Sequence, residues 1–281
     1  PMDGITDKDI YQACHNMFVA NSLAVKACRE IDPAAKMGVM CSFSSIATYP
    51  LNCHPDNAFG TLEFKRVSWF FTDVMCRGHY PGYIYRIWRE KDCAPEMEPG
   101  DKELLAAYTN DYIGFSYYRS AVYSKDVSMA ADTGGVQGVD NPFLTKSSPA
   151  PWSWPIDAKG FRYVCNELTD RYELPLFPVE NGIGLDEHPD ENGEIHDPDR
   201  CEYLADHVRE MKEAIADGCD IMGYLWWGPI DVVSAGTGEM KKRYGFIYVD
   251  RHNDGTGTLE RRKKDSFEYY KKLIASNGEE L

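Results

Sequence analysis

The chain has 281 residues, of which 43% are hydrophobic and 27% are charged, as in an ordinary globular protein. Its formal net charge of −15 argues against nucleic acid and anionic membranes as general partners. No apolar run reaches the roughly 18 residues that a membrane-spanning helix needs, and the first residues form neither a basic start nor an apolar signal core, so neither membrane insertion nor secretion is indicated.

Apolar residues recur along the chain with strand and helix periods in alternation. In chain order, the sequence predicts a helix over 7–30, a strand over 36–43, helices over 62–77 and 101–108, a strand over 112–118, a helix over 159–172, a strand over 174–180, a helix over 199–217, strands over 220–227 and 245–250, and a helix over 264–274. The segment 124–155 is rich in Gly, Pro and Ser and is expected to form a long surface loop.

Several predicted helix ends carry residues typical of caps. Asp7 is expected to cap the first helix, and Pro33 follows its end. Gly78 closes the helix over 62–77. The apolar stripe of that helix is expected to face the core and consists of Val67, Phe70, Phe71, Val74 and Met75. Residues 80–110 are expected to be irregular up to their short final helix.

The order of the elements, one helix followed by strand–helix pairs, predicts a parallel sheet with right-handed crossovers. A complete (β/α)8 TIM barrel needs about 250 residues, so the length alone would allow one. Only four principal strands are predicted, however. Either the loops are unusually long, or the chain is part of a larger barrel. In both cases we expect an α/β fold that forms a single domain over residues 1–281. A start at Pro1 rather than at methionine is in keeping with a fragment or a processed chain.

The nine cysteines are odd in number and include no C-x-x-C pair. This pattern fits reduced thiols in a cytoplasm better than a disulfide framework. The seven histidines show no metal-ligand spacing, so neither a metal nor another cofactor is expected.

The strand over 174–180 ends in a carboxylate, Glu180, and the glycines of Asn181-Gly182-Ile183-Gly184 follow at once. In parallel α/β enzymes the chemistry lies at the carboxyl ends of buried strands. Glu180 is therefore a candidate catalytic residue, and the alternative is a strand-end side chain that only meets solvent.

Five co-linear stretches resemble the family 1 glycoside hydrolases, and among these the bacterial 6-phospho-β-glucosidases. They are the first helix, with Tyr11-Gln12-Ala13-Cys14-His15-Asn16, and the stretches 111–118, 178–184, 223–227 and 243–250. Together they cover nearly the whole chain. The resemblance implies a TIM barrel of which the last four βα units are present, and retaining hydrolysis of 6-phospho-β-glucosides.

A retaining glycosidase uses two carboxyl groups about 5 Å apart, one as nucleophile and one as acid/base. The resemblance makes Glu180 the nucleophile and Tyr117 the hydrogen-bond donor that keeps it ionised. The pattern alone favours the alternative that Tyr117 is a strand aromatic packed under a loop. Ser116 stands where many relatives carry Asn, so no amide contribution is expected there.

The family's acid/base motif, of the Thr-x-Asn-Glu type, has no counterpart in this sequence. The pair Asn166-Glu167 lies within a predicted helix and is expected to be a solvated part of the outer ring. Because the first helix resembles the one that follows the acid/base strand, the chain is expected to begin just after that residue and to have little or no activity alone.

The resemblance implies that Ser234, Lys242 and Tyr244 bind the 6-phosphate, with Lys242 as the cation and the two hydroxyls as donors. The alternative is that 241–243 is one solvated basic run. Ala235 follows Ser234 where phospho-galactosidases tend to carry a bulky Trp, so the resemblance favours gluco over galacto substrates. Trp227 is the expected sugar platform. Its neighbour Trp226 is expected to be core.

These features predict a cytoplasmic enzyme whose partner is a small phosphorylated β-glucoside, with no nucleic acid or membrane partner. Two alternatives remain open, a β-glucosidase fragment for substrates without phosphate and an inactive half-barrel that binds phosphosugars. A half-barrel would expose an apolar edge and inner face, so self-association to cover them is expected.

Overall fold

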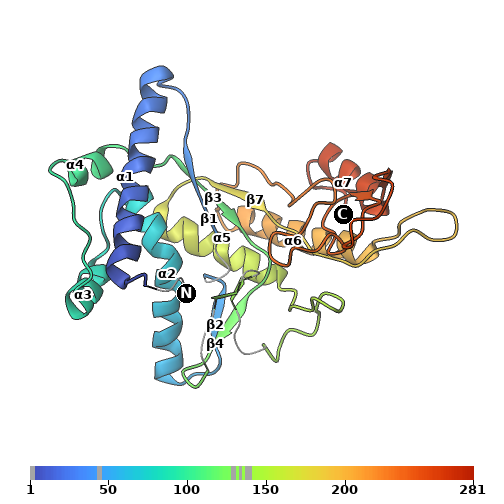
Figure 1. The fold of residues 1–281 in the computed structure, drawn as a ribbon, viewed down its shortest axis with the longest axis horizontal. Helices are drawn as coiled ribbons and strands as arrows, with labels where there is room; N and C mark the ends of the chain where they lie inside the picture. The colour runs from blue at the N-terminus through green and yellow to red at the C-terminus, as the bar shows by residue number, and fades with distance from the viewer. Residues whose placement is uncertain (1–3, 43–45, 128–130, 133–134, 137–140) are drawn as a thin grey trace.

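A three-stranded parallel sheet forms the centre of the molecule (Figure 1). The structure is a computed structural model that describes residues 4–42, 46–127, 131–132, 135–136 and 141–281. The strands β1 (Gly38–Ser42), β3 (Tyr112–Ser116) and β7 (Leu176–Glu180) lie in that spatial order. Residues 220–227 run alongside β7, because Leu176 pairs with Ile221 and the amide N–H of Leu225 donates to the carbonyl of Pro178.

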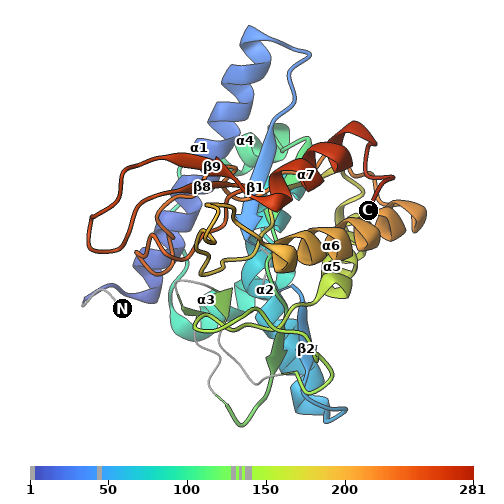
Figure 2. The ribbon, with the colours of Figure 1, turned by 90° about the vertical axis from the view of Figure 1, so that its right-hand side faces the viewer.

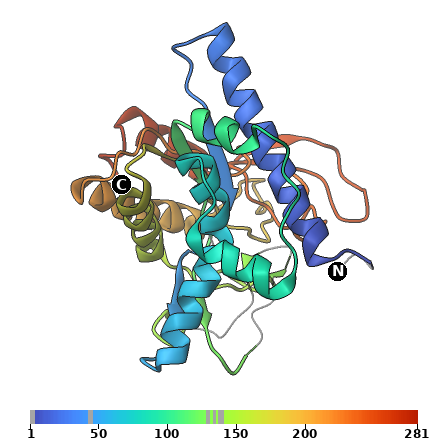
Figure 3. The same ribbon diagram turned by 90° about the vertical axis from the view of Figure 1, so that its left-hand side faces the viewer.

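Helices cover one face of this sheet. They are α1 (Asp7–Ile31), α2 (Pro55–Arg77), α5 (Ala158–Tyr172), α6 (Pro198–Ala216) and α7 (Asp265–Ala275), with the shorter α3 (Gly82–Lys91) and α4 (Asp101–Ala107) outside α1 and α2. Figure 2 looks onto α5, α6 and α7, and Figure 3 onto α1. No helix in the described ranges has the length and apolar character that a bilayer crossing requires.

The two faces of the sheet differ in burial. Val39, Ile113 and Leu176 point toward the helices and are at most 5% exposed. The opposite face carries apolar side chains that are about half exposed, with Met40 at 49%, Met222 at 54% and Leu225 at 48%. Because side chains alternate along a strand, these residues lie on the face opposite the helices, called the inner face below, and no described element covers it fully.

Six shorter strands of the described residues form three pairs in addition to the central sheet. Strands β2 (Thr48–Pro50) and β4 (Ala121–Tyr123) form a parallel pair, β5 (Ala131–Asp132) and β6 (Gly135–Val136) an antiparallel pair. The antiparallel pair β8 (Ile247–Val249) and β9 (Arg261–Lys263) forms a hairpin that projects on the side away from α6 in Figure 2.

The alternation of helices and strands is as predicted, with several local corrections. The N-cap of α1 is Thr6, which closes a capping box with Asp9, so Asp7 is the first helical residue rather than the cap. Helix α2 begins at Pro55, because His54 accepts from the amide of Asp56 and Pro55 fits the first turn. Gly78 ends it in the left-handed region, as expected.

Two further predictions were wrong. Residues 80–110 are not irregular throughout, because α3 lies within them and buries Ile84 and Trp88. Val67 is 60% exposed, so it is not part of the core stripe of α2, unlike Phe70 and Val74. The predicted strand over 36–43 extends into Phe43, which lies outside the described residues, and that over 220–227 holds one isolated bridge to β7.

Candidate functional site

Glu180 lies at the carboxyl end of β7, opposite Ser116 at the end of β3. The amide N–H of Tyr117 donates to the backbone carbonyl of Glu180 over 2.9 Å, so the ends of β3 and β7 are hydrogen-bonded where the site begins. The register of β3 and β7 shifts between Phe115 and Ser116. The regular pairing of β3 thus ends just before Tyr117 and Tyr118.

The hydroxyl of Tyr118 donates to Oε2 of Glu180 over 3.0 Å. The prediction that Tyr117 makes this bond is wrong, because the Tyr117 side chain is fully buried and its hydroxyl donates to the carbonyl of Asp157 over 2.6 Å. Adjacent side chains of extended backbone point to opposite faces, so only one of the two tyrosines can face Glu180. Sequence reasoning chose the wrong neighbour of this pair.

The pKa of Tyr118 is raised, first by burial and then by the charge of Glu180. The phenol therefore keeps its proton and remains a donor toward the carboxylate. A hydrogen bond to the charged form stabilises an ionised carboxylate, so this contact suits a carboxylate that has to act in its ionised form.

Asn181 is completely buried and ties three segments together. Its side-chain amide donates to the carbonyl of Tyr117 over 2.7 Å and to the hydroxyl of Tyr203 over 3.0 Å, and its Oδ1 accepts from the hydroxyl of Tyr224 over 2.7 Å. The Tyr203 hydroxyl in turn donates to the carbonyl of Tyr118. Asn181 thus fixes the backbone on both sides of the Glu180–Tyr118 contact, a role that the local sequence does not reveal.

The segment that carries Ser234, Lys242 and Tyr244 folds over the turn after β7. Leu185 and Arg243 exchange two backbone hydrogen bonds of 2.9 Å in an antiparallel bridge. The ring of Tyr244 lies 6.4 Å from that of Tyr118, edge to face. Ser234, Lys242 and Tyr244 are all buried, at 3%, 5% and 7% exposure. Lys242 is therefore not part of a solvated basic run.

Three aromatic rings surround the ammonium group of Lys242. Its Nζ lies 4.7 Å from the ring centre of Trp154, 5.6 Å from that of Trp152 and 5.9 Å from that of Tyr244. Electron-rich ring faces attract a cation at such distances. The two tryptophans come from the loop before α5, so this loop contributes to the site.

Two glycines of the turn after β7 permit these contacts. A Cβ on Gly184 would lie 2.8 Å from Cγ of Lys242 and 3.0 Å from Cε2 of Tyr244. A Cβ on Gly182 would meet the rings of Trp226 and Tyr244 at 3.3 and 3.4 Å. The glycines are thus needed for close packing against the neighbouring segment and not only to end a strand.

Trp227 and Trp226 have different environments. Trp227 is partly exposed at the end of 220–227, where its amide N–H donates to the carbonyl of Asn181 over 2.9 Å. Trp226 is 7% exposed, packs against Tyr203 and Phe246, and donates from Nε1 to the carbonyl of Tyr244. The prediction that Trp226 belongs to the core is confirmed.

Glu167 lies in α5, as predicted, and its carboxylate is held there. Nζ of Lys65, on α2, lies 3.0 Å from Oε1 of Glu167, and the hydroxyl of Tyr163 contacts the same oxygen. This carboxylate joins two helices of the outer layer.

Comparisons with known proteins agree on one family. The profile of Glycosyl hydrolase family 1 matches residues 3–279. Aryl-phospho-β-D-glucosidase BglH of Bacillus subtilis is 51% identical over 97% of this chain and 57% of its own length. A 6-phospho-β-glucosidase of Clostridium longisporum is 48% identical over 99% of this chain and 59% of its own. The chain thus spans less than two thirds of the length of these relatives.

Solved structures give the same fold. All of this chain superposes on 60% of the family 1 β-glucosidase from Thermotoga maritima, with a TM-score of 0.80 at 24% sequence identity. At this identity the likeness is one of fold alone. It confirms that the chain is built on the (β/α)8 barrel type.

Proposed function

The chain belongs to glycosyl hydrolase family 1, and on that premise we propose that it supplies the nucleophile and the phosphate site of a retaining 6-phospho-β-glucosidase. The observation that carries the proposal is the arrangement at the end of β7. A carboxylate that accepts a phenol hydrogen bond lies beside a buried segment that bears a lysine, a serine and a tyrosine. The names of the similar relatives, phospho-β-glucosidases, support the substrate class.

In this proposal Glu180 is the nucleophile. With Oε2 held by Tyr118, Oε1 attacks the anomeric carbon of the sugar. The bond from that carbon to the leaving oxygen breaks, and its electron pair goes to the oxygen, which takes a proton from the acid. Water then hydrolyses the glycosyl ester and releases glucose 6-phosphate with retained configuration.

Lys242 supplies the positive charge for the 6-phosphate, and the hydroxyls of Ser234 and Tyr244 supply directed donors. The burial of all three supports this role, because a cation held among aromatic rings in a strongly acidic protein gains from a dianionic partner. Trp227, partly exposed at the same end of the sheet, is proposed to stack on the sugar ring.

The acid/base is proposed to come from outside these residues. The sequence contains no Thr-x-Asn-Glu motif, and Glu167 is held by Lys65 and Tyr163 between two helices. We accordingly interpret residues 1–281 as one domain that corresponds to the last four βα units of the barrel. We also propose that the chain self-associates through the half-exposed inner face and that it functions in a reducing cytoplasm. All nine cysteines lie in the described ranges and are free thiols, in keeping with that location.

Turnover by the chain alone tests the missing acid. An activated aryl 6-phospho-β-glucoside should be hydrolysed poorly or not at all, because the second step needs a base that this chain is proposed to lack. Near-normal turnover would refute the proposed division of the site.

Two alternatives are separable by binding. A fragment of a β-glucosidase for substrates without phosphate would bind glucose and glucose 6-phosphate with similar affinity. The proposed site should prefer glucose 6-phosphate, and Lys242→Ala should abolish that preference, as calorimetry can measure. An inactive phosphosugar-binding half-barrel would share the preference, but it would not be labelled at Glu180 by a mechanism-based fluoroglycoside.

A further inference from the structure

The guanidinium group of Arg200, on α6, is completely buried and makes five hydrogen bonds. Nε donates to Asp197 over 2.8 Å, and one Nη2 bond of 2.6 Å reaches Glu187. The other three reach backbone carbonyls, so every N–H of the group has an acceptor.

Those three carbonyls belong to two different parts of the candidate site. Nη1 donates to the carbonyls of Ile183, over 2.9 Å, and Tyr244, over 2.8 Å, and Nη2 donates to that of Arg243, over 3.3 Å. Ile183 lies in the turn that follows Glu180. Arg243 and Tyr244 adjoin or form the proposed phosphate ligands. The guanidinium group of Arg200 therefore connects the turn that follows Glu180 to the segment that carries the proposed phosphate ligands.

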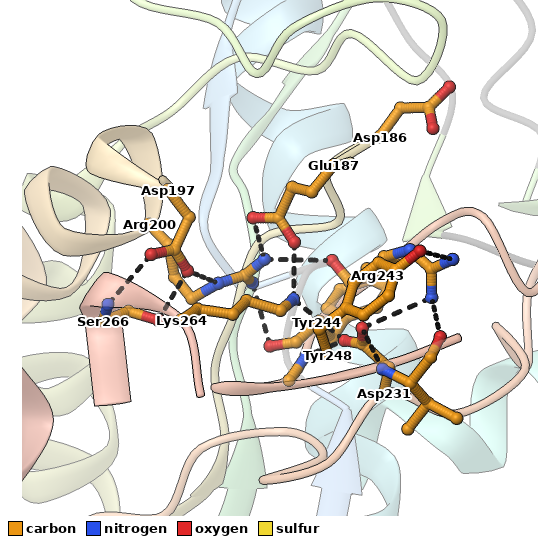
Figure 4. A network of polar contacts seen from close by, with 12 residues as sticks. Asp186, Glu187, Asp197, Arg200, Asp231, Arg243, Tyr244, Tyr248, Lys264 and Ser266 are labelled. Atoms are coloured by element: carbon orange, nitrogen blue, oxygen red, sulfur yellow. Dashed lines mark hydrogen bonds and ion pairs between the residues drawn. The ribbon is translucent and has the colours of Figure 1, made fainter. Parts of the chain in front are cut away.

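Arg200 is itself held in a buried network of balanced charge (Figure 4). Glu187 also accepts from Lys264, whose Nζ lies 3.0 Å from Asp231, and Asp231 accepts from Arg243. The network contains three cations and three anions, all at most 8% exposed, namely Arg200, Arg243, Lys264, Glu187, Asp197 and Asp231. Buried charges of this kind are costly to leave unpaired, so the group has little freedom to move.

We propose that Arg200 is a positioning residue that sets the spacing between Glu180 and the phosphate ligands, and thereby the preference for a sugar 6-phosphate over its separate parts. The proposal rests on the proposed function. In glucose 6-phosphate the ring and the short C6–O6 arm limit how far the phosphate can lie from the anomeric carbon. A site can engage both ends only if its own two halves are held at the matching separation.

Lysine cannot replace this group. It carries the same charge but donates from one atom, so it cannot reach the carbonyls of Ile183 and Tyr244 together with Asp197 and Glu187. Arg200→Lys should therefore keep the charge balance of the network and loosen the connection between the two segments.

The first test compares two probes on the full chain, glucose 6-phosphate and inorganic phosphate. Arg200→Lys should weaken glucose 6-phosphate about tenfold or more while phosphate changes by less than about twofold, because only the first probe depends on spacing. The matched control is Arg171→Lys. Arg171 lies 2.7 Å from the buried Asp73 and joins α5 to α2, away from both segments. Equal losses for both probes, or in both variants, would overturn the proposal.

A second measurement needs no ligand. Hydrogen exchange should accelerate together at the amides of Leu185 and Arg243 in Arg200→Lys, and not in Arg171→Lys, because these amides form the bridge between the two segments. Unchanged exchange at both amides would contradict the proposed role. A wild-type chain without preference for glucose 6-phosphate would instead refute the proposed function, and amide exchange would still decide the role of Arg200.

If Arg200→Lys fails to fold, the wild-type chain gives the answer by NMR. The guanidinium protons of Arg200, identified by their proximity to Ile183 and Tyr244, should show separate signals, since five hydrogen bonds block rotation of the group. A single averaged signal would refute the proposed positioning role of Arg200.

Discussion

At the residue scale, two adjacent tyrosines, Tyr117 and Tyr118, have different roles, because only Tyr118 contacts Glu180. Tyr118 faces the carboxylate, whereas Tyr117 faces Asp157 at the N-cap of α5. A Cβ at Gly160 would collide with the Tyr117 hydroxyl, so the glycine leaves the space that this buried side chain occupies. The distinction can be tested by substitution.

We expect Tyr118→Phe to slow labelling of Glu180 by an aryl 2-fluoro-6-phospho-β-glucoside with a dinitrophenolate leaving group. The loss of a hydrogen bond to a charged group, about 1.5–3 kcal/mol, corresponds to roughly a tenfold to hundredfold slower reaction. Dinitrophenolate departs without an acid, so intact-mass measurement on the chain alone suffices. Tyr117→Phe should leave labelling within about threefold and lower the free energy of unfolding by about 1 kcal/mol. Similar slowing in both variants would contradict the assignment.

His207 predicts a pH dependence of stability. Its ring is fully buried and stacked on Tyr203, and Nδ1 donates to the Tyr203 carbonyl over 2.7 Å. Burial lowers its pKa from 6.5 to about 4. Since the folded pKa lies below the unfolded one, the stabilising effect of the neutral ring is complete above about pH 6.5 and is lost as the pH falls toward 4.

The free energy of unfolding should therefore drop by about 2 kcal/mol from this group between pH 7 and pH 5. Urea unfolding at both pH values measures the drop, and His207→Phe serves as the comparison, because it retains a ring and removes the titration. Parallel pH profiles for the two proteins would show that His207 does not titrate in this way.

At the scale of elements, the sequence predicted most helices and the parallel strands, because both depend on local periodicity. Strand 112–118 ends at Ser116 in the structure, where the register shift begins, and helix α3 was missed in a segment with mixed apolar spacing. The turn after β7 was recognised by its glycines. What these glycines contact could not be predicted, since Lys242 is 58 residues from Gly184 in the sequence.

We expect Gly184→Ala to weaken glucose 6-phosphate binding about tenfold with a change in stability of about 1 kcal/mol. The added Cβ would lie 2.8 Å from Cγ of Lys242, whose flexible side chain has to move from its position among the rings. Gly82→Ala is the control, because a Cβ at Gly82 would have no neighbour within 4 Å among the described residues. If calorimetry shows that Gly184→Ala binds glucose 6-phosphate as tightly as the wild-type chain, the proposed close packing of Gly184 against Lys242 is refuted.

At the scale of the whole molecule, the sheet has one face covered by helices and one face with half-exposed apolar side chains. Exposed apolar surface of this kind drives association. We expect the chain to sediment at tens of micromolar as a species heavier than its 31.9 kDa monomer. Met40→Glu, on the open face of β1, should shift it toward the monomer.

Phe143→Glu is the matched control for that measurement, because Phe143 is 86% exposed, belongs to no strand of the sheet and should not affect the association. A wild-type chain that remains monomeric would rule out self-association through the inner face. A shift of equal size in both variants would show that a general hydrophobic effect, rather than this face, drives it.

The amino-acid sequence by itself determined the alternating strands and helices, the place of Glu180 at a strand end and the glycines after it, because these follow from local spacing and turn chemistry. Only the tertiary structure decided that Tyr118, not Tyr117, contacts Glu180, that aromatic rings enclose Lys242, and that Arg200 joins the two halves of the candidate site. Such contacts join residues far apart in the chain, and their geometry depends on register shifts and packing that no local pattern encodes.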